Sequence, residues 1–125
     1  MTDGKLSPPA ILIVEDDQLL KFLTVNIVEE AGCVALHAAS ADEAVAILES
    51  RSDVALLLTD IDMPGSMDGL KLAHAVRSRW PPIKIVVVSG QVRLSENDLP
   101  TNSRFFVKPY HAEAMISEIR SLIGA

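Results

Sequence analysis

The sequence has a single cysteine, few aromatic residues and fewer basic than acidic side chains. Cys33 has no second cysteine with which to form an internal disulfide, which favours a reducing compartment. With 11 basic and 17 acidic residues, the formal net charge is −6, so the chain lacks the phosphate-neutralising charge on which nucleic-acid binding depends. No apolar run approaches the roughly 18 to 20 residues that span a bilayer. We therefore expect a soluble, cytoplasmic protein that binds neither nucleic acid nor a membrane.

The first nine residues, MTDGKLSPP, contain two prolines, one lysine and no apolar segment. This composition predicts a flexible leader over residues 1–9, which is neither a signal peptide nor an anchor. Residues 10–125 have the length of one domain with a single core, and a hydrophobic fraction of 49% is typical of a packed globule.

Short apolar runs alternate with stretches whose apolar residues recur at helical spacing. The runs that predict β-strands are residues 10–14, 34–39, 55–60, 83–88 and 104–108. The helical stretches end near residues 31, 49, 79 and 123, whereas residues 91–102 are polar, contain Pro100 and predict only a short or poorly ordered helix. Strands that alternate with helices predict an α/β domain with a parallel sheet and helices on both of its faces.

The polar residues that stand out each close a predicted strand. Glu15 and Asp16 follow the first strand, Asp60 the third, Ser89 the fourth and Lys108 the fifth. Because parallel strands end at one edge of a sheet, we expect these side chains to converge. Clustered carboxylates either raise the pKa of one of them or recruit a cation, and for a cation the oxygen ligands favour Mg²⁺ or Mn²⁺. A lysine and a hydroxyl beside a carboxylate are suited to hold phosphoryl oxygens, so the arrangement fits phosphoryl transfer to that carboxylate.

At this point the chain resembles the response regulator receiver domain of two-component signalling, in its stand-alone, single-domain form. The resemblance covers nearly the whole chain, from about Ala10 to Ile123. The motifs that carry it are Glu15-Asp16-Asp17, Asp60-Ile61-Asp62-Met63-Pro64, Met67-Asp68-Gly69, Ser89-Gly90 and Lys108-Pro109. It implies a flavodoxin-like (βα)5 three-layer sandwich with a five-stranded parallel sheet and a short or poorly ordered fourth helix.

The resemblance also implies a role for each residue on the phosphoryl side of the site. Asp60 would be the phosphoacceptor, Lys108 would contact the phosphoryl group, and Ser89 would supply the switch hydroxyl. Phe105 matches the aromatic switch position, although it has no hydroxyl and could move inward only through burial. The Lys108–Pro109 peptide bond is expected to be cis, which is plausible only because proline follows.

On the metal side, the resemblance implies a Mg²⁺ (or Mn²⁺) ion held by Asp16 and Asp60, with Glu15 reaching it through water. Asp62 would contribute its backbone carbonyl and not its side chain. The loop PGSMDG, residues 64–69, is one residue longer than the common pattern, which could alter access of a partner or solvent to the phosphate.

By this resemblance the protein would take a phosphoryl group from a histidine kinase or a histidine phosphotransfer protein onto Asp60. The phosphorylated form would then bind an unknown downstream protein or form a homodimer. It is not expected to be an enzyme, beyond its own phosphorylation and dephosphorylation. One alternative is a degenerate receiver that acts only as a binding module. The other is an aspartyl phosphatase, because Asp60-x-Asp62 imitates the Asp-x-Asp signature of haloacid-dehalogenase-like enzymes, where the pair follows the first strand.

Overall fold

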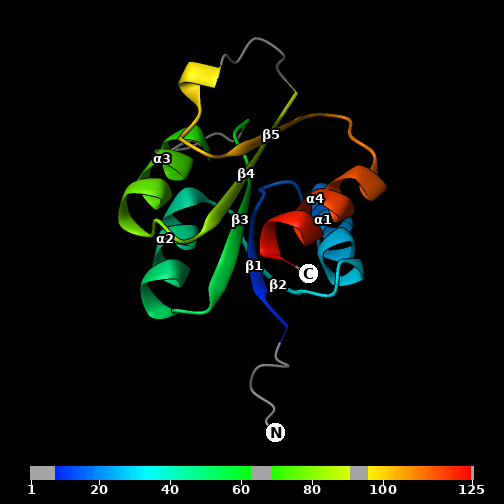
Figure 1. The fold of residues 1–125 in the computed structure, drawn as a ribbon, viewed down its shortest axis with the longest axis horizontal. Helices are drawn as coiled ribbons and strands as arrows, with labels where there is room; N and C mark the ends of the chain where they lie inside the picture. Colours follow the sequence, from blue (N-terminus) through cyan, green and yellow to red (C-terminus); the bar gives the residue numbers. More distant parts are fainter. Residues whose placement is uncertain (1–7, 63–68, 91–95, 125) are drawn as a thin grey trace, which may run out of the picture.

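The computed structural model describes residues 8–62, 69–90 and 96–124, in which helices and strands alternate along the chain (Figure 1). The predicted leader therefore lies outside the described residues except for Pro8 and Pro9. The elements are β1 (Ala10–Val14), α1 (Gln18–Glu30), β2 (Val34–Ala38), α2 (Ala41–Ser50), β3 (Val54–Asp60), α3 (Gly69–Arg79), β4 (Lys84–Ser89), the 3₁₀ turn η2 (Glu96–Asp98), β5 (Arg104–Val107) and α4 (Ala112–Ile123).

The five strands form one parallel sheet in the order β2-β1-β3-β4-β5. Helices α2 and α3 cover one face of the sheet, and α1 and α4 cover the other (Figure 1). The predicted three-layer, flavodoxin-like α/β architecture is confirmed. Strands β1 and β3 are interior strands of the sheet, so the carboxyl end of each lies between the carboxyl ends of its two neighbours. This is the edge at which the polar residues were predicted to meet.

The core consists of two layers, one on each face of the sheet, because successive strand residues point to opposite faces. In β1, Leu12 and Val14 pack toward α2 and α3, while Ile11 and Ile13 pack toward α1 and α4. All five β1 residues are buried, which explains why this strand is an unbroken apolar run without polar alternation.

Side-chain caps fix where two of the helices begin. The Asp17 carboxylate accepts a hydrogen bond from the Leu20 amide (2.9 Å) at the start of α1. The Ser40 hydroxyl accepts one from the Glu43 amide (3.1 Å), and the Glu43 carboxylate accepts one from the Ala39 amide (2.8 Å). The capping pattern predicted at the start of α2 is therefore formed.

The connection between β4 and β5 departs from a regular strand-helix alternation. Within its described part, residues 96–103, the only helical segment is the single 3₁₀ turn η2, so no α-helix follows β4 there. This part of the chain is held against α3 instead: His74 Nε2 lies 2.8 Å from the Asp98 carbonyl, and Arg77 Nε donates to the Thr101 carbonyl (2.9 Å). Leu99 is half-buried against the core layer under α2 and α3, and Pro100 is buried, so this part contributes single apolar residues to the core and not the apolar stripe of an α-helix.

Helix α1 buries less of its apolar surface than its spacing suggested. Only Thr24 and Val28 of this helix are buried, whereas Phe22 is 61% exposed and Leu23 is 47% exposed. The amino-terminal half of α1 therefore presents apolar side chains to solvent. Across the part of the chain that the structure describes, no helix is both long enough and apolar enough to cross a bilayer.

Candidate functional site

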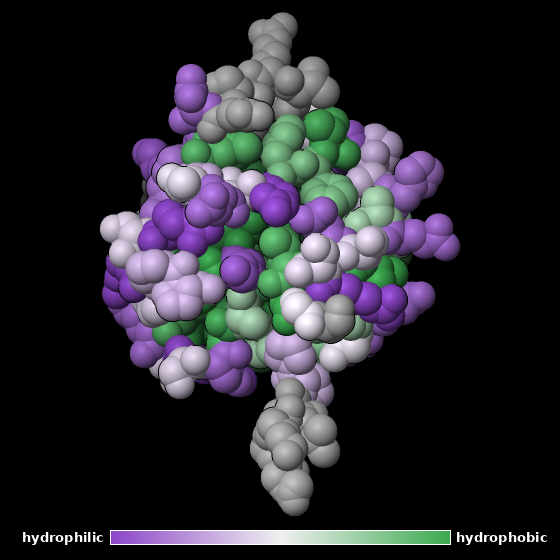
Figure 2. Space-filling view, in the orientation of Figure 1, coloured by the Kyte–Doolittle hydropathy of each residue, from purple (hydrophilic) through white to green (hydrophobic). Residues whose placement is uncertain are grey.

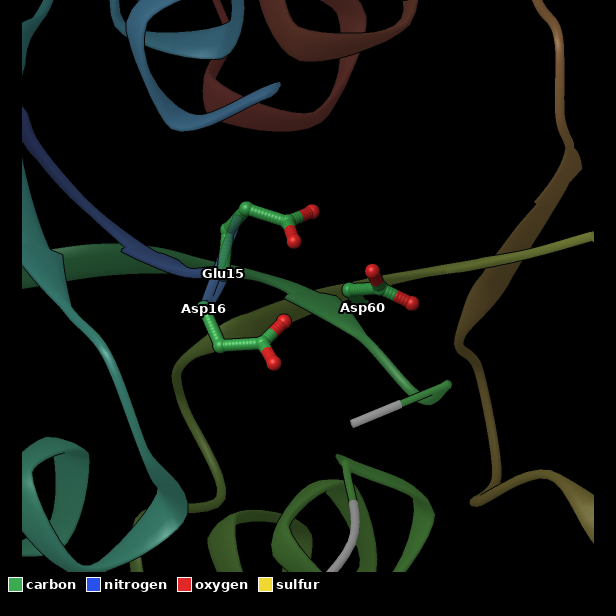
Figure 3. Close-up of side chains that lie close together, drawn as sticks. All are labelled: Glu15, Asp16 and Asp60. Carbon is green, nitrogen blue, oxygen red and sulfur yellow. The ribbon is translucent and has the colours of Figure 1, made fainter. Parts of the chain in front are cut away.

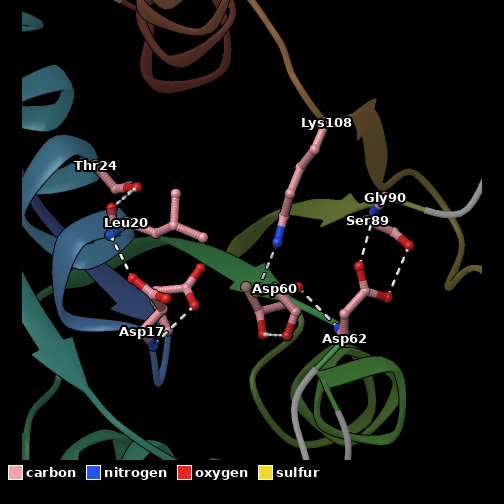
Figure 4. A network of polar contacts seen from close by, with 10 residues as sticks. Asp17, Leu20, Thr24, Asp60, Asp62, Ser89, Gly90 and Lys108 are labelled. Atoms are coloured by element: carbon pink, nitrogen blue, oxygen red, sulfur yellow. Dashed lines mark hydrogen bonds and ion pairs between the residues drawn. The ribbon is translucent and has the colours of Figure 1, made fainter.

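Backbone hydrogen bonds between neighbouring strands bring the predicted site residues to one edge of the sheet. Glu15 directly follows β1, and its amide donates to the Ala38 carbonyl (3.0 Å) at the end of β2. Asp60 is the last residue of β3. Lys108 follows β5, and its amide donates to the Ser89 carbonyl (2.9 Å) at the end of β4. Residues distant in sequence thus meet because parallel strands end together (Figure 4).

Three carboxylates form a cluster at this edge: those of Glu15, Asp16 and Asp60 (Figure 3). One carboxylate oxygen from each lies within 4.8 Å of the others. Glu15 and Asp60 are each only 6% exposed, whereas Asp16 is exposed. The cluster therefore combines two desolvated acids with one that reaches solvent, and its mutual repulsion favours binding of a cation.

Glu15 shows the electrostatic cost of this cluster most clearly. Burial raises the pKa of its carboxyl group to about 7 from an ordinary value of 4.5. The hydrogen bond that it accepts from the Asp17 amide (3.1 Å) opposes this rise, and the neighbouring Asp60 adds to it. Near neutral pH, Glu15 is therefore poised to lose a proton when a cation arrives.

Lys108 supplies the positive charge of the site. Its Nζ donates to Asp60 Oδ2 at 2.7 Å, and the side chains are 25% and 5% exposed respectively. Burial alone would lower the pKa of Lys108, but the hydrogen bond and the charges of Asp60 and Glu15 outweigh it, and the net pKa lies above its usual value. The ammonium group thus stays protonated beside the Asp60 carboxylate.

The other Asp60 oxygen, Oδ1, accepts a hydrogen bond from the Asp62 amide (2.8 Å). The Asp62 carboxylate turns away from the acidic cluster toward the end of β4 (Figure 4). There it accepts hydrogen bonds from the Ser89 hydroxyl (3.0 Å) and the Gly90 amide (2.7 Å). The Ser89 hydroxyl predicted to face the phosphoryl group therefore donates to the Asp62 carboxylate, a contact that no spacing in the sequence predicted.

Gly69, the first residue of α3, has a steric role at the site. A Cβ atom at this position would collide with the backbone of Asp60 and Ile61. Glycine therefore lets α3 begin directly against the end of β3. Residues 63–68, including Met67, Asp68 and most of the longer loop noted in the sequence, lie outside the described residues.

The donor set fits a divalent cation such as Mg²⁺ or Mn²⁺. Every side-chain ligand in the cluster is a carboxylate oxygen, and hard cations prefer oxygen ligands. The carboxylates of Glu15, Asp16 and Asp60 lie close enough together to hold one ion, and direct binding by Asp16 and Asp60 stays a prediction. Metal binding through the Asp62 carbonyl and through a water on Glu15 also stays a prediction, because the cluster is defined by side-chain carboxylate oxygens alone.

A cavity of about 510 Å³ opens beside the acidic cluster, between α1 and the segment that follows β5. Apolar side chains line it, among them Leu20, Leu23 and Tyr110, and it reaches Asp60 and Lys108. Burial raises the pKa of the Tyr110 phenol, a hydrogen bond with Thr24 opposes this rise, and the ring stacks edge-on against Phe106. The sequence does not indicate this cavity, because the apolar residues of α1 have the same spacing as core residues.

The predicted switch residue Phe105 lies in β5, half-buried against the core layer under α2 and α3. Hydrophobic residues gather in the centre and upper half of the face in Figure 2, where Figure 1 places β4 and β5; Val107 of β5 is 37% exposed. The Lys108–Pro109 peptide bond is cis.

Comparison with known proteins assigns the chain to a family. Residues 11–120 match the response regulator receiver domain family, and the chain belongs to it. It is 32% identical over 118 residues to the response regulator receiver protein CpdR of Brucella abortus (strain 2308), covering 92% of this chain and 97% of that protein. It is also 28% identical over 117 residues to the sensor kinase CckA of the same organism, covering 90% of this chain but 12% of the kinase.

A solved response regulator receiver protein from Sinorhizobium medicae WSM419 superposes with a TM-score of 0.88 at 25% sequence identity, covering 96% of this chain and 98% of that one. The chain is therefore a receiver domain of two-component signalling, and the resemblance drawn from its motifs is confirmed. Its acidic pocket fits the phosphorylation site of such a domain.

Proposed function

We propose that this protein accepts a phosphoryl group on Asp60 from a phosphohistidine on a histidine kinase or a histidine phosphotransfer protein. The observation that carries the proposal is the 2.7 Å contact between Lys108 Nζ and Asp60 Oδ2, beside the carboxylates of Glu15 and Asp16. A buried carboxylate with a cation on one side and a cation-recruiting cluster on the other is equipped to become the mixed anhydride of a phosphoryl group.

In the transfer, a carboxylate oxygen of Asp60 forms the new P–O bond while the P–N bond to the donor imidazole breaks. The imidazole nitrogen takes the electron pair of that bond. Bound Mg²⁺ supplies positive charge that offsets the phosphoryl oxygens. Lys108 gives up its contact with the Asp60 carboxylate and pairs with a phosphoryl oxygen, so its charge stays compensated before and after transfer. Each protein molecule accepts one phosphoryl group, and we propose no catalytic turnover beyond its own phosphorylation and dephosphorylation.

The donor protein would dock over the amino-terminal half of α1. This part of α1 exposes Leu19 (66%), Phe22 (61%) and Leu23 (47%), an amount of apolar surface that favours a partner. The adjoining cavity leads to Asp60 and Lys108, so a helix lying against these residues would bring an imidazole to the acceptor. The similarity to part of a sensor kinase supports a donor of this class.

The output would follow from the new charge on Asp60. A phosphoryl group would draw in Lys108, which follows β5, and Ser89, which ends β4. The half-buried Phe105 of β5 would repack in response. The altered surface over these two strands would bind a downstream protein or a second copy of the chain.

The test is the intact mass of the protein after incubation with Mg²⁺ and acetyl phosphate. We expect one added phosphoryl group that depends on the metal and is absent from Asp60→Asn. Asp53→Asn removes the same charge from the exposed Arg51–Asp53 pair and should label like the wild type. Equal labelling of Asp60→Asn would refute the acceptor assignment, and no labelling of a folded, Mg²⁺-binding wild type by a phosphohistidine donor would indicate a binding module.

A further inference from the structure

The side chain of Asp62 makes contacts that the predicted role of its backbone carbonyl as a metal ligand does not require. It is exposed, yet both of its carboxylate oxygens are bound: Oδ1 to the Ser89 hydroxyl and Oδ2 to the Gly90 amide. An exposed aspartate that only ends a loop would be solvated by water at little cost. The two contacts instead tie Asp62, two residues after the end of β3, to the end of β4 (Figure 4).

The Ser89 hydroxyl and the Gly90 amide together form a small anion site near the phosphoacceptor Asp60. The Asp62 amide is itself bonded to Asp60 Oδ1, so its carboxylate and that of Asp60 are neighbours. A hydroxyl and an amide that converge on a carboxylate present the same geometry to phosphoryl oxygens. Ser89 has one O–H and Gly90 one N–H, so neither can serve the Asp62 carboxylate and a phosphoryl group at full strength together.

We propose that Asp62 is an internal anion that occupies the Ser89 hydroxyl and the Gly90 amide in the unphosphorylated protein and must leave them when Asp60 is phosphorylated. This proposal rests on the proposed function of Asp60 and adds a specific restraint to it. We call the pair of contacts from Asp62 to Ser89 and Gly90 the Asp62 latch.

The latch opposes phosphorylation in two ways. The incoming group must break two existing hydrogen bonds, both made to a charged acceptor. It also brings negative charge next to the Asp62 carboxylate, which repels it until that side chain swings away. In Asp62→Asn both effects weaken, because the amide is neutral and has one acceptor oxygen in place of two.

Binding of Mg²⁺ with beryllium trifluoride, a stable mimic of a phosphoryl group, measures this restraint without chemistry or a partner. We expect Asp62→Asn to bind the mimic about tenfold more tightly than the wild type, measured by fluorine NMR or calorimetry. Asp17→Asn is the matched control: it removes one negative charge near the site, keeps a good helix cap for α1 and leaves the latch intact. Its affinity should stay within about twofold of the wild type.

A second measurement separates the latch from general charge effects. In ligand-free protein, the Gly90 amide proton resonance should move on Asp62→Asn and stay in place in Asp17→Asn. In a Ser89→Ala background, the gain from Asp62→Asn should shrink, because one of the contested donors is gone.

If the wild type binds the mimic but Asp62→Asn binds it no more tightly than Asp17→Asn does, the latch is overturned. The acceptor role of Asp60 would still stand in that case. A folded wild type that neither binds the mimic nor gains mass from acetyl phosphate or a phosphohistidine donor would instead overturn the proposed function, and the latch with it.

Discussion

Raising the pH in the absence of divalent metal should destabilise this protein, because Glu15 must then carry its charge at a buried position beside Asp60. The folded protein raises the pKa of Glu15 from 4.5 to about 7, so between these values the folded state holds a proton that the unfolded state has released. The stabilisation from that proton is complete below about pH 4.5 and is lost as the pH rises through about 7.

The size of the effect follows from the pKa change. Each pH unit between the two pKa values corresponds to about 1.4 kcal/mol, so the loss in free energy of unfolding amounts to at most about 3.5 kcal/mol. For a domain of this size that is roughly a 10 °C fall in the melting temperature. Mg²⁺ compensates the same charge, so its stabilising effect should be larger at about pH 8 than at about pH 5.5.

The assay is thermal unfolding across this pH range, with and without Mg²⁺, in wild type and Glu15→Gln. The variant cannot ionise at this position, so subtracting its curve removes the titration of all other groups. We expect the metal-free wild type to lose stability relative to Glu15→Gln as the pH rises. Parallel curves for the two proteins would refute the reasoning, since Glu15 would then be as well solvated in the folded state as in the unfolded state.

Three further substitutions test other parts of the site. Lys108→Met should slow metal-dependent labelling by acetyl phosphate at least about 100-fold, because the transferring group loses its fixed cation; labelling at the wild-type rate would exclude that role. Gly69→Ala should lower the free energy of unfolding in urea by about 1–3 kcal/mol, since its methyl group meets the Asp60 backbone, and an unchanged midpoint would contradict that contact. Phe22→Glu should slow phosphoryl transfer from a phosphohistidine protein about tenfold or more while changing labelling by acetyl phosphate little; equal effects on both donors would argue against docking on α1.

Helix α1 and the β4–β5 connection show how much of the structure the local sequence pattern can predict. The spacing correctly predicted that α1 is helical, and the structure has it from Gln18 to Glu30. For residues 91–102 the sequence predicted a short or poorly ordered helix, and the described residues 96–103 contain the 3₁₀ turn η2 in its place. The sequence could not indicate which apolar residues of α1 stay exposed. Burial depends on what packs against a helix, and α4 and the sheet reach its carboxyl-terminal half around Val28 but leave Phe22 uncovered.

The sequence by itself determined the fold class and the identities of the main site residues. Apolar runs of strand length and helical spacing between them specify a parallel sheet, and a parallel sheet brings Glu15, Asp60 and Lys108 to one edge whatever separates them along the chain. Local periodicity was enough here because the site is built from strand ends.

Only the tertiary structure decided how those side chains interact. The 2.7 Å pairing of Lys108 with Asp60 depends on the strand order, which inserts β4 between β3 and β5. The direction of the Asp62 carboxylate depends on the approach of the β3 and β4 ends, which no spacing in the sequence encodes. Hydrogen bonds and desolvation act over a few ångströms, so they are settled only when distant segments pack against each other.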